Sequence, residues 1–438
     1  MHSACILVQS ARHWLGRVSL AVMDQALFSG STLVVNIMLA RWLALSDYGA
    51  FAVSFFVLLL LAGIHAALIA EPATVLGAAR YAHVKQTYLA RVFRLHSFLT
   101  ICTSFILASI CLGILSSQPM LAYSLLGVAV AQPTLLRFWL VRRVCYLEGL
   151  PGVALAITGV YAFLLSVGLA FLHHAKLISP FNAFLAVGAA SLFAAALGLR
   201  WLGMKSAGPT PDRDTPSLLD ICRHHWSHGR WILGASLANT AGAAALLPVV
   251  GYVLGLESAG KLRAVQNVVA PALQATTALG ALLLPHMCRQ YVGSGISALR
   301  ASLRGAVLGN AILVLGYGLS LVLTGEFLLL ALYRDPRIAE LYWMLPFFVA
   351  ASLAMGMSQP VGLALRAVEQ PRAIWRSKLV AVVCFVLLGP PLIWNAGMSG
   401  VAWCVVLLAA AEAAALASSA RRLLVDNVRR SQVIAEIS

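Results

Sequence analysis

Charged residues are scarce in this chain of 438 residues, and acidic ones are the scarcest. Asp and Glu number 15 and Lys and Arg number 31, so charged types make up only 11% of the sequence. Hydrophobic types make up 61%, and the mean hydropathy is +0.88. Soluble domains carry about 25% charged residues, so this composition excludes an ordinary soluble protein.

Several catalytic and cofactor-binding signatures are also missing. The sequence has no nucleotide-binding Gly-rich loop of the Walker type and no hydrolase nucleophile elbow. His224, His225 and His228 are spaced as ligands on one helix face, but the sequence positions no Cys, Asp or Glu with them. We interpret this run as packing at the membrane interface. We therefore expect neither an enzyme, nor a cofactor, nor a bound metal.

Long apolar runs dominate what is present. Each is long enough to cross roughly 30 Å of hydrocarbon as a helix, and the alternating pattern of a membrane barrel is absent. The sequence predicts an all-α polytopic membrane protein with about twelve transmembrane helices. The predicted spans are 19–41, 48–70, 95–115, 119–141, 152–172, 179–201, 230–254, 262–287, 305–325, 341–365, 379–396 and 400–420.

The basic residues lie mostly on one side of these spans. With both termini in the cytoplasm, 25 of the 31 Lys and Arg side chains fall in or next to cytoplasmic segments, and six fall outside. This bias follows the positive-inside rule and predicts an inner-membrane protein with both ends cytoplasmic. Because anionic lipid headgroups account for the net charge of +16, we expect no nucleic-acid partner. No cysteine falls in a predicted exterior loop, so no disulfide is expected.

The only linker rich in Pro, Ser and Asp lies between the sixth and seventh spans. It divides the chain into a six-helix lobe at 1–201, a cytoplasmic linker at 202–229, a second six-helix lobe at 230–420 and a cytoplasmic tail at 421–438. An even number of crossings gives both lobes the same orientation, as in a parallel two-lobed transporter. The predicted exterior loops are too short to form a catalytic domain.

The first span carries a polar stripe, since Gln25, Ser29, Thr32 and Asn36 recur at helical spacing with Asp24 beside them. Polar side chains in lipid face the bundle interior or a water-filled cavity. We interpret the stripe as a cavity wall, with interhelical hydrogen bonding as the alternative. Asn239 in the seventh span and Gln266, Asn267 and Gln274 in the eighth are further candidates for the same cavity.

Ionisable groups in or near the spans complete the candidate site, because their insertion into lipid is costly. Arg137 and Glu412 lie within predicted spans, while Arg41 and Glu71 lie at span edges. His65 also lies within a span, where it is either a proton relay or a hydrogen-bonded histidine of the helix bundle.

The region 24–72 resembles the amino-terminal region of polysaccharide exporters in the multidrug/oligosaccharidyl-lipid/polysaccharide flippase superfamily. The resemblance covers roughly the first 75 residues and ends with Glu71-Pro72, as in a subgroup found beside exopolysaccharide genes. Its core consists of Leu39, Ala40, Arg41, Leu43, Tyr48, Gly49 and Phe51.

This resemblance implies two six-helix bundles around a central cavity and a flippase for polyprenyl-pyrophosphate-linked oligosaccharide. It implies the membrane lipid as a second partner and leaves room for contacts with other polysaccharide assembly proteins. Family cavities are often rich in Arg, whereas the predicted spans here contain only Arg137. The main alternative function is a cation-coupled drug or metabolite antiporter of the same superfamily, for which a buried carboxylate such as Asp24 would be suited. A major-facilitator-type transporter and a membrane-embedded glycan enzyme are less favoured by the loops.

Overall fold

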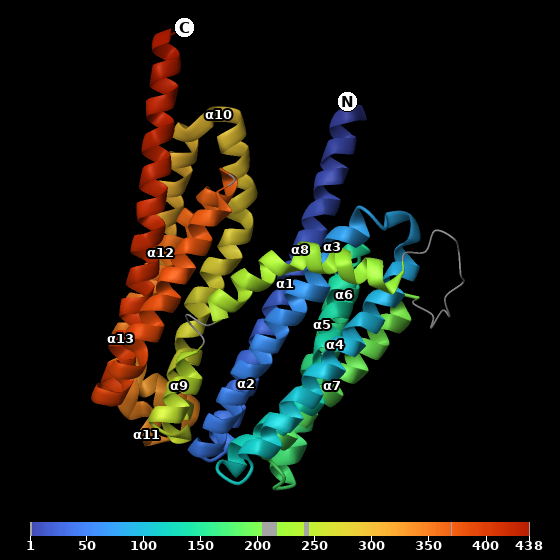
Figure 1. Cartoon of the computed structure of the whole chain (residues 1–438), viewed down its shortest axis with the longest axis vertical. Coiled ribbons are helices and arrows are strands. Elements are labelled where there is room, and N and C mark those ends of the chain that lie inside the picture. Colours follow the sequence, from blue (N-terminus) through green and yellow to red (C-terminus); the bar gives the residue numbers. More distant parts are fainter. Residues whose placement is uncertain (1, 204–216, 241–244, 369, 438) are drawn as a thin grey trace. The chain divides into compact units, whose positions relative to one another are not determined.

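The computed structural model describes residues 2–203, 217–240, 245–368 and 370–437 (Figure 1). These ranges are helical and contain no strand, which confirms the predicted all-α fold. The chain forms two compact units, Met1–Leu237 and Ala238–Ser438. The elements of the first unit are α1 His2–Trp42, α2 Leu45–His65, the π-helix η1 Ala66–Ala70, α3 Glu71–Ala78, the 3₁₀-helix η2 Ala82–Val84, α4 Lys85–Ile114, α5 Pro119–Leu147, α6 Pro151–His174, α7 Pro180–Trp201 and α8 Leu218–Asn239, which ends just past the boundary. Those of the second unit are α9 Leu246–Val253, α10 Leu256–Tyr333, α11 Pro336–Ala339, the 3₁₀-helix η4 Glu340–Met344, α12 Leu345–Ala367 and α13 Pro371–Ile437.

Nine helical segments within the described residues are long and apolar enough to cross a membrane. The first six predicted spans each fall in one such segment, as do 305–325 and 341–365. The last two predicted spans share the segment Arg372–Arg421, and the spans predicted at 230–254 and 262–287 have no segment of their own. The chain is therefore a multi-pass membrane protein.

Two long elements each contain a sharp break at a glycine. Gly295 in α10 has φ 73° and ψ −162°, and Gly397 in α13 has φ 57° and ψ −134°. Only glycine adopts such backbone angles without a clash of its side chain. The two sides of α10 then pack against each other, because Met287 and Leu299 share one apolar cluster (Figure 1). Each element is thus a pair of predicted helices joined by a tight turn.

The predicted helix at 230–254 is wrong in its boundaries. Helix α8 begins twelve residues earlier, where Ser217 and Asp220 form a capping box: Ser217 Oγ accepts from the Asp220 amide at 3.1 Å, and Asp220 Oδ2 accepts from the Ser217 amide at 3.3 Å. Helix α8 ends at Asn239, and α9 begins at Leu246. Pro248 lies in the first turn of α9, where the missing amide hydrogen costs nothing. Part of the predicted linker is therefore helix.

Helix α5 forms the centre of the first unit, where it packs against α2, α4, α6 and α7. Its side chains Phe138, Leu140 and Val141 are fully buried. Helix α1 packs mainly against α6. In the second unit, α12 packs between α10 and α13, and α9 packs against both α10 and α13.

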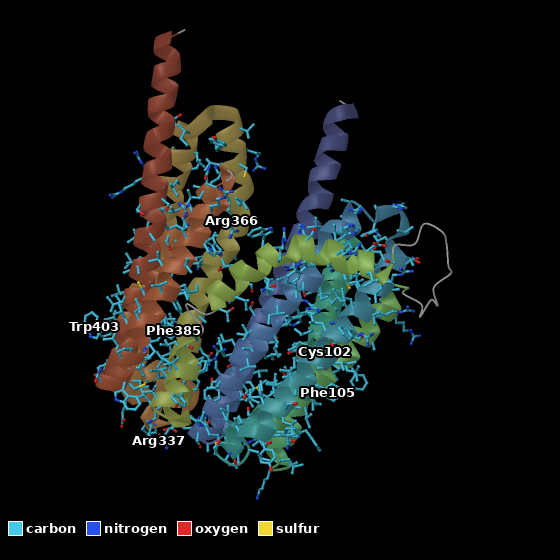
Figure 2. All side chains as sticks on the ribbon, viewed as in Figure 1. Cys102, Phe105, Arg337, Arg366, Phe385 and Trp403 are labelled. Carbon is cyan, nitrogen blue, oxygen red and sulfur yellow. The ribbon has the colours of Figure 1, made fainter. Side chains whose placement is uncertain are left out.

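Large apolar side chains also remain exposed on both units. Phe105 on α4 is 72% exposed, and Trp403 on α13 is 55% exposed (Figure 2). Such surfaces are costly in water and favourable against lipid tails. They agree with helices that cross a membrane.

Candidate functional site

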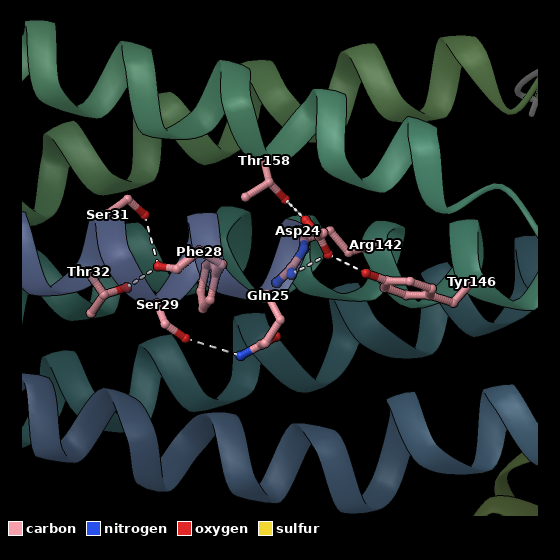
Figure 3. Close-up of polar contacts among 9 residues, drawn as sticks. All are labelled: Asp24, Gln25, Phe28, Ser29, Ser31, Thr32, Arg142, Tyr146 and Thr158. Atoms are coloured by element: carbon pink, nitrogen blue, oxygen red, sulfur yellow. Dashed lines mark hydrogen bonds and ion pairs between the residues drawn. The ribbon is translucent and has the colours of Figure 1, made fainter. Parts of the chain in front are cut away.

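The polar stripe of helix α1 consists of side chains that bond along their own helix. Gln25 is exposed, Ser29 and Thr32 are half-buried, and Asn36 is buried. Gln25 Nε2 donates to Ser29 Oγ at 3.3 Å, and Thr32 Oγ1 donates to the Phe28 carbonyl at 3.0 Å (Figure 3). Asn36 Nδ2 donates to the Thr32 carbonyl at 2.8 Å. The end of the stripe at Gln25 and Ser29 is therefore its open part, whereas the end at Asn36 is buried.

Asp24 is separated from this stripe by burial. Its side chain is completely enclosed, whereas the neighbouring Gln25 is exposed. Asp24 Oδ2 accepts from Arg142 Nη2 at 2.6 Å and from the Tyr146 hydroxyl, and Oδ1 accepts from the Thr158 hydroxyl (Figure 3). These partners belong to α5 and α6. The carboxylate therefore joins three helices inside the first unit, and does not line the mouth of the stripe as the sequence suggested.

The Arg142 side chain of this pair lies against two aromatic rings. The Arg142 guanidinium carbon lies 4.5 Å from the centre of the Phe28 ring and 5.8 Å from that of Phe138. Rings at this distance attract a cation through their negative faces. A buried carboxylate that has a guanidinium and two hydroxyl donors is well satisfied, so the pair holds its geometry. Its direct effect in this structure is to fix α1 against α5 and α6.

Sequence reasoning missed Arg142 because of one helix boundary. The predicted fourth span ended at residue 141, whereas α5 continues to Leu147. That boundary places Arg142 in a loop, whereas in the structure Arg142 lies about one turn before the end of α5 and is 9% exposed. The usable signal was the unmatched charge of Asp24, which required a cationic partner somewhere in the bundle. The neutral partners Tyr146 and Thr158 gave no such signal.

A second buried polar pair lies next to the π-helix. His65 ends α2, and its Nε2 lies 2.9 Å from Nδ1 of His96 on α4. Each residue is only 2% exposed. Arg137 on α5 is half-buried, with its guanidinium carbon 5.9 Å from the centre of the Phe93 ring. The structure thus gives His65 a histidine partner that the sequence did not identify.

The remaining predicted site residues are dispersed. Glu71 pairs with Arg143 at 2.9 Å, and both side chains are more than one-third exposed, so the pair contributes little. Arg41 is exposed. Asn239 is the last residue of α8, and its side chain lies outside the described ones. On α10, Asn267 is buried, Gln274 is exposed and Gln266 lines a cavity of the second unit.

Two histidines of α8 bind that helix to the rest of the first unit. Tyr81 and His224 share a hydrogen bond of 2.7 Å, and Tyr88 and His225 share one of 2.8 Å. His225 Nδ1 lies 2.9 Å from the Leu68 carbonyl. That carbonyl would normally accept from residue 72, which is a proline and has no amide hydrogen. Burial lowers the pKa of His225, so the neutral ring is favoured in this contact.

The second unit contains two adjoining cavities. A cavity of about 270 Å³ is lined by residues that include Arg263, Gln266 and Glu412, and one of about 500 Å³ is lined by residues that include Arg366 and Lys378. Glu412 lines both cavities and pairs with Lys378 at 2.6 Å. The rest of the larger wall combines apolar side chains with hydroxyl and amide groups. A wall of this composition can contact both the polar and the apolar part of an amphiphile. Among the described residues there is no cluster of three or more potential metal ligands.

These features define a helical membrane protein of two units that has a polar face in one unit and charged cavities in the other. The chain has the fold of the MATE and MurJ transporters. It is similar to an inward-facing MATE family transporter of the MOP superfamily, with 12% identity, a TM-score of 0.79, and coverage of 94% of this chain and 98% of that one. It is also similar to the lipid II flippase MurJ, with 11% identity, a TM-score of 0.72, and coverage of 92% and 87%.

A MOP superfamily transporter from Pyrococcus furiosus is similar as well, with 12% identity, a TM-score of 0.67, and coverage of 93% and 95%. No family model and no curated protein sequence matches the chain. The fold that the resemblance implies is therefore confirmed, and these similarities show the fold alone. At 11–12% identity, the substrates of these proteins cannot be assigned to this chain by similarity.

Proposed function

We propose that the chain is a flippase that moves lipid-linked oligosaccharide or polysaccharide repeat units across the inner membrane by alternating access. The substrate class is a polyprenyl pyrophosphate that carries sugars. Such a molecule has a charged, hydrogen-bonding head and a lipid tail, so it requires a passage with both polar and apolar walls. Both termini are cytoplasmic in this proposal, as the distribution of basic residues predicts.

The mixed wall of the larger cavity is the observation that carries the proposal. Arg366 and Lys378 supply positive charge, and Thr276 and Thr277 supply hydroxyl groups. Apolar side chains complete the wall: Leu273, Leu284, Leu363, Ile374 and Leu416. Cationic and hydroxyl groups bind phosphate oxygens, and the aliphatic groups are compatible with a prenyl chain. Because the two cations outnumber the single carboxylate of the wall, Glu412, the same cavity would be a poor site for a hydrophobic cation.

The open part of the α1 stripe supplies hydrogen-bonding groups suited to the sugar. Gln25 has an amide and Ser29 a hydroxyl, and their only bond within the described residues joins them to each other. Neutral groups of this kind bind sugar hydroxyls without fixing one particular sugar. They support a carrier head of variable composition.

The alternative is a cation-coupled drug or metabolite antiporter, which the similarity to MATE transporters favours. In that case Asp24 would be the carboxylate to bind a cation. The Arg142 guanidinium already neutralises Asp24 at 2.6 Å. A cationic drug would have to displace a buried partner, so the flippase is the better supported function.

The test is a translocation assay with the full chain in liposomes. A polyprenyl-pyrophosphate-linked oligosaccharide that carries a fluorophore on its sugar is placed in both leaflets, and dithionite is added outside. Dithionite quenches only the outer leaflet, so a flippase raises the quenched fraction above that of empty liposomes. An unchanged fraction, together with ethidium efflux driven by a cation gradient, would instead establish the antiporter.

A further inference from the structure

An ion pair separates the two cavities of the second unit. Glu412 and Lys378 lie on the two sides of the break at Gly397 in α13, and Lys378 Nζ lies 2.6 Å from Glu412 Oε1. The two side chains are 20% and 28% exposed, so neither is fully sealed from the cavities. Glu412, Leu273 and Met355 are shared by both cavity walls. The carboxylate is therefore placed at the boundary between them.

The other charged residues that line the two cavities are all positive. Arg263 on α10 lines the smaller cavity, Arg366 on α12 lines the larger one, and Lys378 comes from α13 itself. Glu412 is the only acidic residue in either wall. An anion that enters the larger cavity thus meets two cations, one of which is already paired. Binding of both cations by the anion requires Lys378 to leave Glu412.

We propose that this pair is an anion–proton exchange site: a phosphate or pyrophosphate head takes Lys378 from Glu412, and Glu412 takes up one proton from water. The inference rests on the proposed function, because it assumes an anionic amphiphile as the substrate. The phosphate oxygens replace the carboxylate as partners of the ammonium group. The incoming proton forms an O–H bond on the carboxylate, and no covalent bond of the substrate changes.

The physical reason is the cost of an unpaired charge in a low-dielectric wall. A carboxylate that loses its cation in such a place becomes neutral instead of remaining ionised without a partner. A neutral carboxyl group can then donate a hydrogen bond to the bound head or to a nearby amide. When the head leaves, Lys378 returns and the proton is released. Each transported head is thereby linked to one proton.

The experiment uses the purified full chain in neutral detergent micelles, with farnesyl pyrophosphate as the probe and farnesol as the uncharged comparison. Binding is measured by calorimetry, and proton uptake by a pH dye in weak buffer. We expect wild-type protein to take up about one proton more per bound probe than Glu412→Gln. Subtraction of the variant removes protons that the probe itself gains. Lys378→Gln should weaken binding by about tenfold or more.

A matched control lies at the start of α10. Glu257 pairs with Lys261 at 2.8 Å and lines neither cavity, so Glu257→Gln should bind and take up protons as wild type does. The pH dependence gives an independent measurement on the wild type alone. Because binding requires a proton, the affinity of the wild type for the probe should fall as pH rises, and that of Glu412→Gln should fall less.

The outcomes distinguish a failure of the exchange site from a failure of the flippase function. Binding of farnesyl pyrophosphate with equal proton uptake in wild type and Glu412→Gln overturns the exchange site, and leaves the flippase in place. Equal binding of farnesyl pyrophosphate and farnesol overturns both, because it removes the anionic head as the recognised group. The double variant Lys378→Gln/Glu412→Gln removes the ion pair and leaves the net charge of the wall unchanged. Weak binding without extra proton uptake in that variant, at a normal elution volume, supports the exchange site independently of folding defects.

Discussion

Removal of the Asp24 charge is the sharpest test of the packing in the first unit. In Asp24→Asn the carbonyl oxygen can still accept from Arg142 and Tyr146, while the new amide nitrogen faces the Thr158 hydroxyl. The shape is retained and the charge is lost. Arg142, only 9% exposed, would then be a buried cation without an anion. Breaking a buried pair in this way costs about 3–5 kcal/mol.

Thermal unfolding in detergent measures this loss. For a unit of this size each kcal/mol lowers the melting temperature by about 2–4 °C, so the variant should melt roughly 6–20 °C lower. Cys145 gives a built-in probe of unfolding. Its side chain is fully buried and directly precedes Tyr146 in α5, so its thiol should react with a maleimide dye only after unfolding. The double variant Asp24→Asn/Arg142→Met removes the stranded cation. It should recover most of the loss.

The matched control is Glu71→Gln, which breaks the pair with Arg143 on the same helix α5. That pair is largely exposed and worth about 0–1 kcal/mol, so the melting temperature should hardly change. If Asp24→Asn melts at the temperature of Glu71→Gln, or if the losses of Asp24→Asn and Arg142→Met simply add, the buried pair does not hold the unit together. Either result would show that the Asp24–Arg142 pair contributes no more than an exposed pair.

Three further predictions test topology, transport and the docking of α8. A reporter that is active only in the periplasm should be active when fused near Lys176 and silent near Asp212; activity at Asp212 would overturn the assignment of the termini to the cytoplasm. Gln25→Ala should abolish transport, because it removes a hydrogen-bonding group of the stripe. The protein level should stay normal, because this exposed amide supports no packing. Full export of surface polysaccharide would exclude a role for the stripe. The pKa of His225 is lowered in the folded state, so the stability that neutral His225 contributes is present above its unfolded value of about 6.5 and is lost as pH falls below it. The labelling rate of Cys222 on α8 by a maleimide, divided by the rate of a free thiol at the same pH, should therefore rise below that pH; a ratio independent of pH would show that the contact does not hold α8.

The sequence predicted the class of fold well, because the signal for membrane helices is local. A run of about twenty apolar residues is sufficient to identify a span, whatever it packs against. Boundaries were less secure. The prediction of the seventh span failed because helix α8 begins at its own capping box at Ser217 and ends at Asn239, and a new helix, α9, begins at Leu246. Helix α5 continued past its apolar run, since a paired arginine is tolerated in a bundle.

The candidate site was only partly accessible to sequence reasoning. Helical periodicity placed Gln25 and Ser29 together, and the structure shows them bonded. Periodicity also placed Asp24 beside them, but a step of one residue turns a helical side chain by about 100°. That rotation carries Asp24 into the packing of α1 against α5 and α6. The packing of α1 against α5 and α6 therefore buries Asp24, whereas Gln25 stays exposed.

The sequence alone was sufficient for the membrane class and the helical architecture, while the side of the membrane favoured by each loop stays a prediction. Each of these depends on the composition of short segments and on their contact with lipid. The polar partners followed only from the packing of the helices: Asp24 with Arg142 across 118 positions, His65 with His96 across 31, and Lys378 with Glu412 across the break at Gly397. These pairs depend on the rotation and contact of whole helices. Since any buried charge requires a partner but not a particular one, a single sequence states the requirement and the fold chooses the residue that meets it.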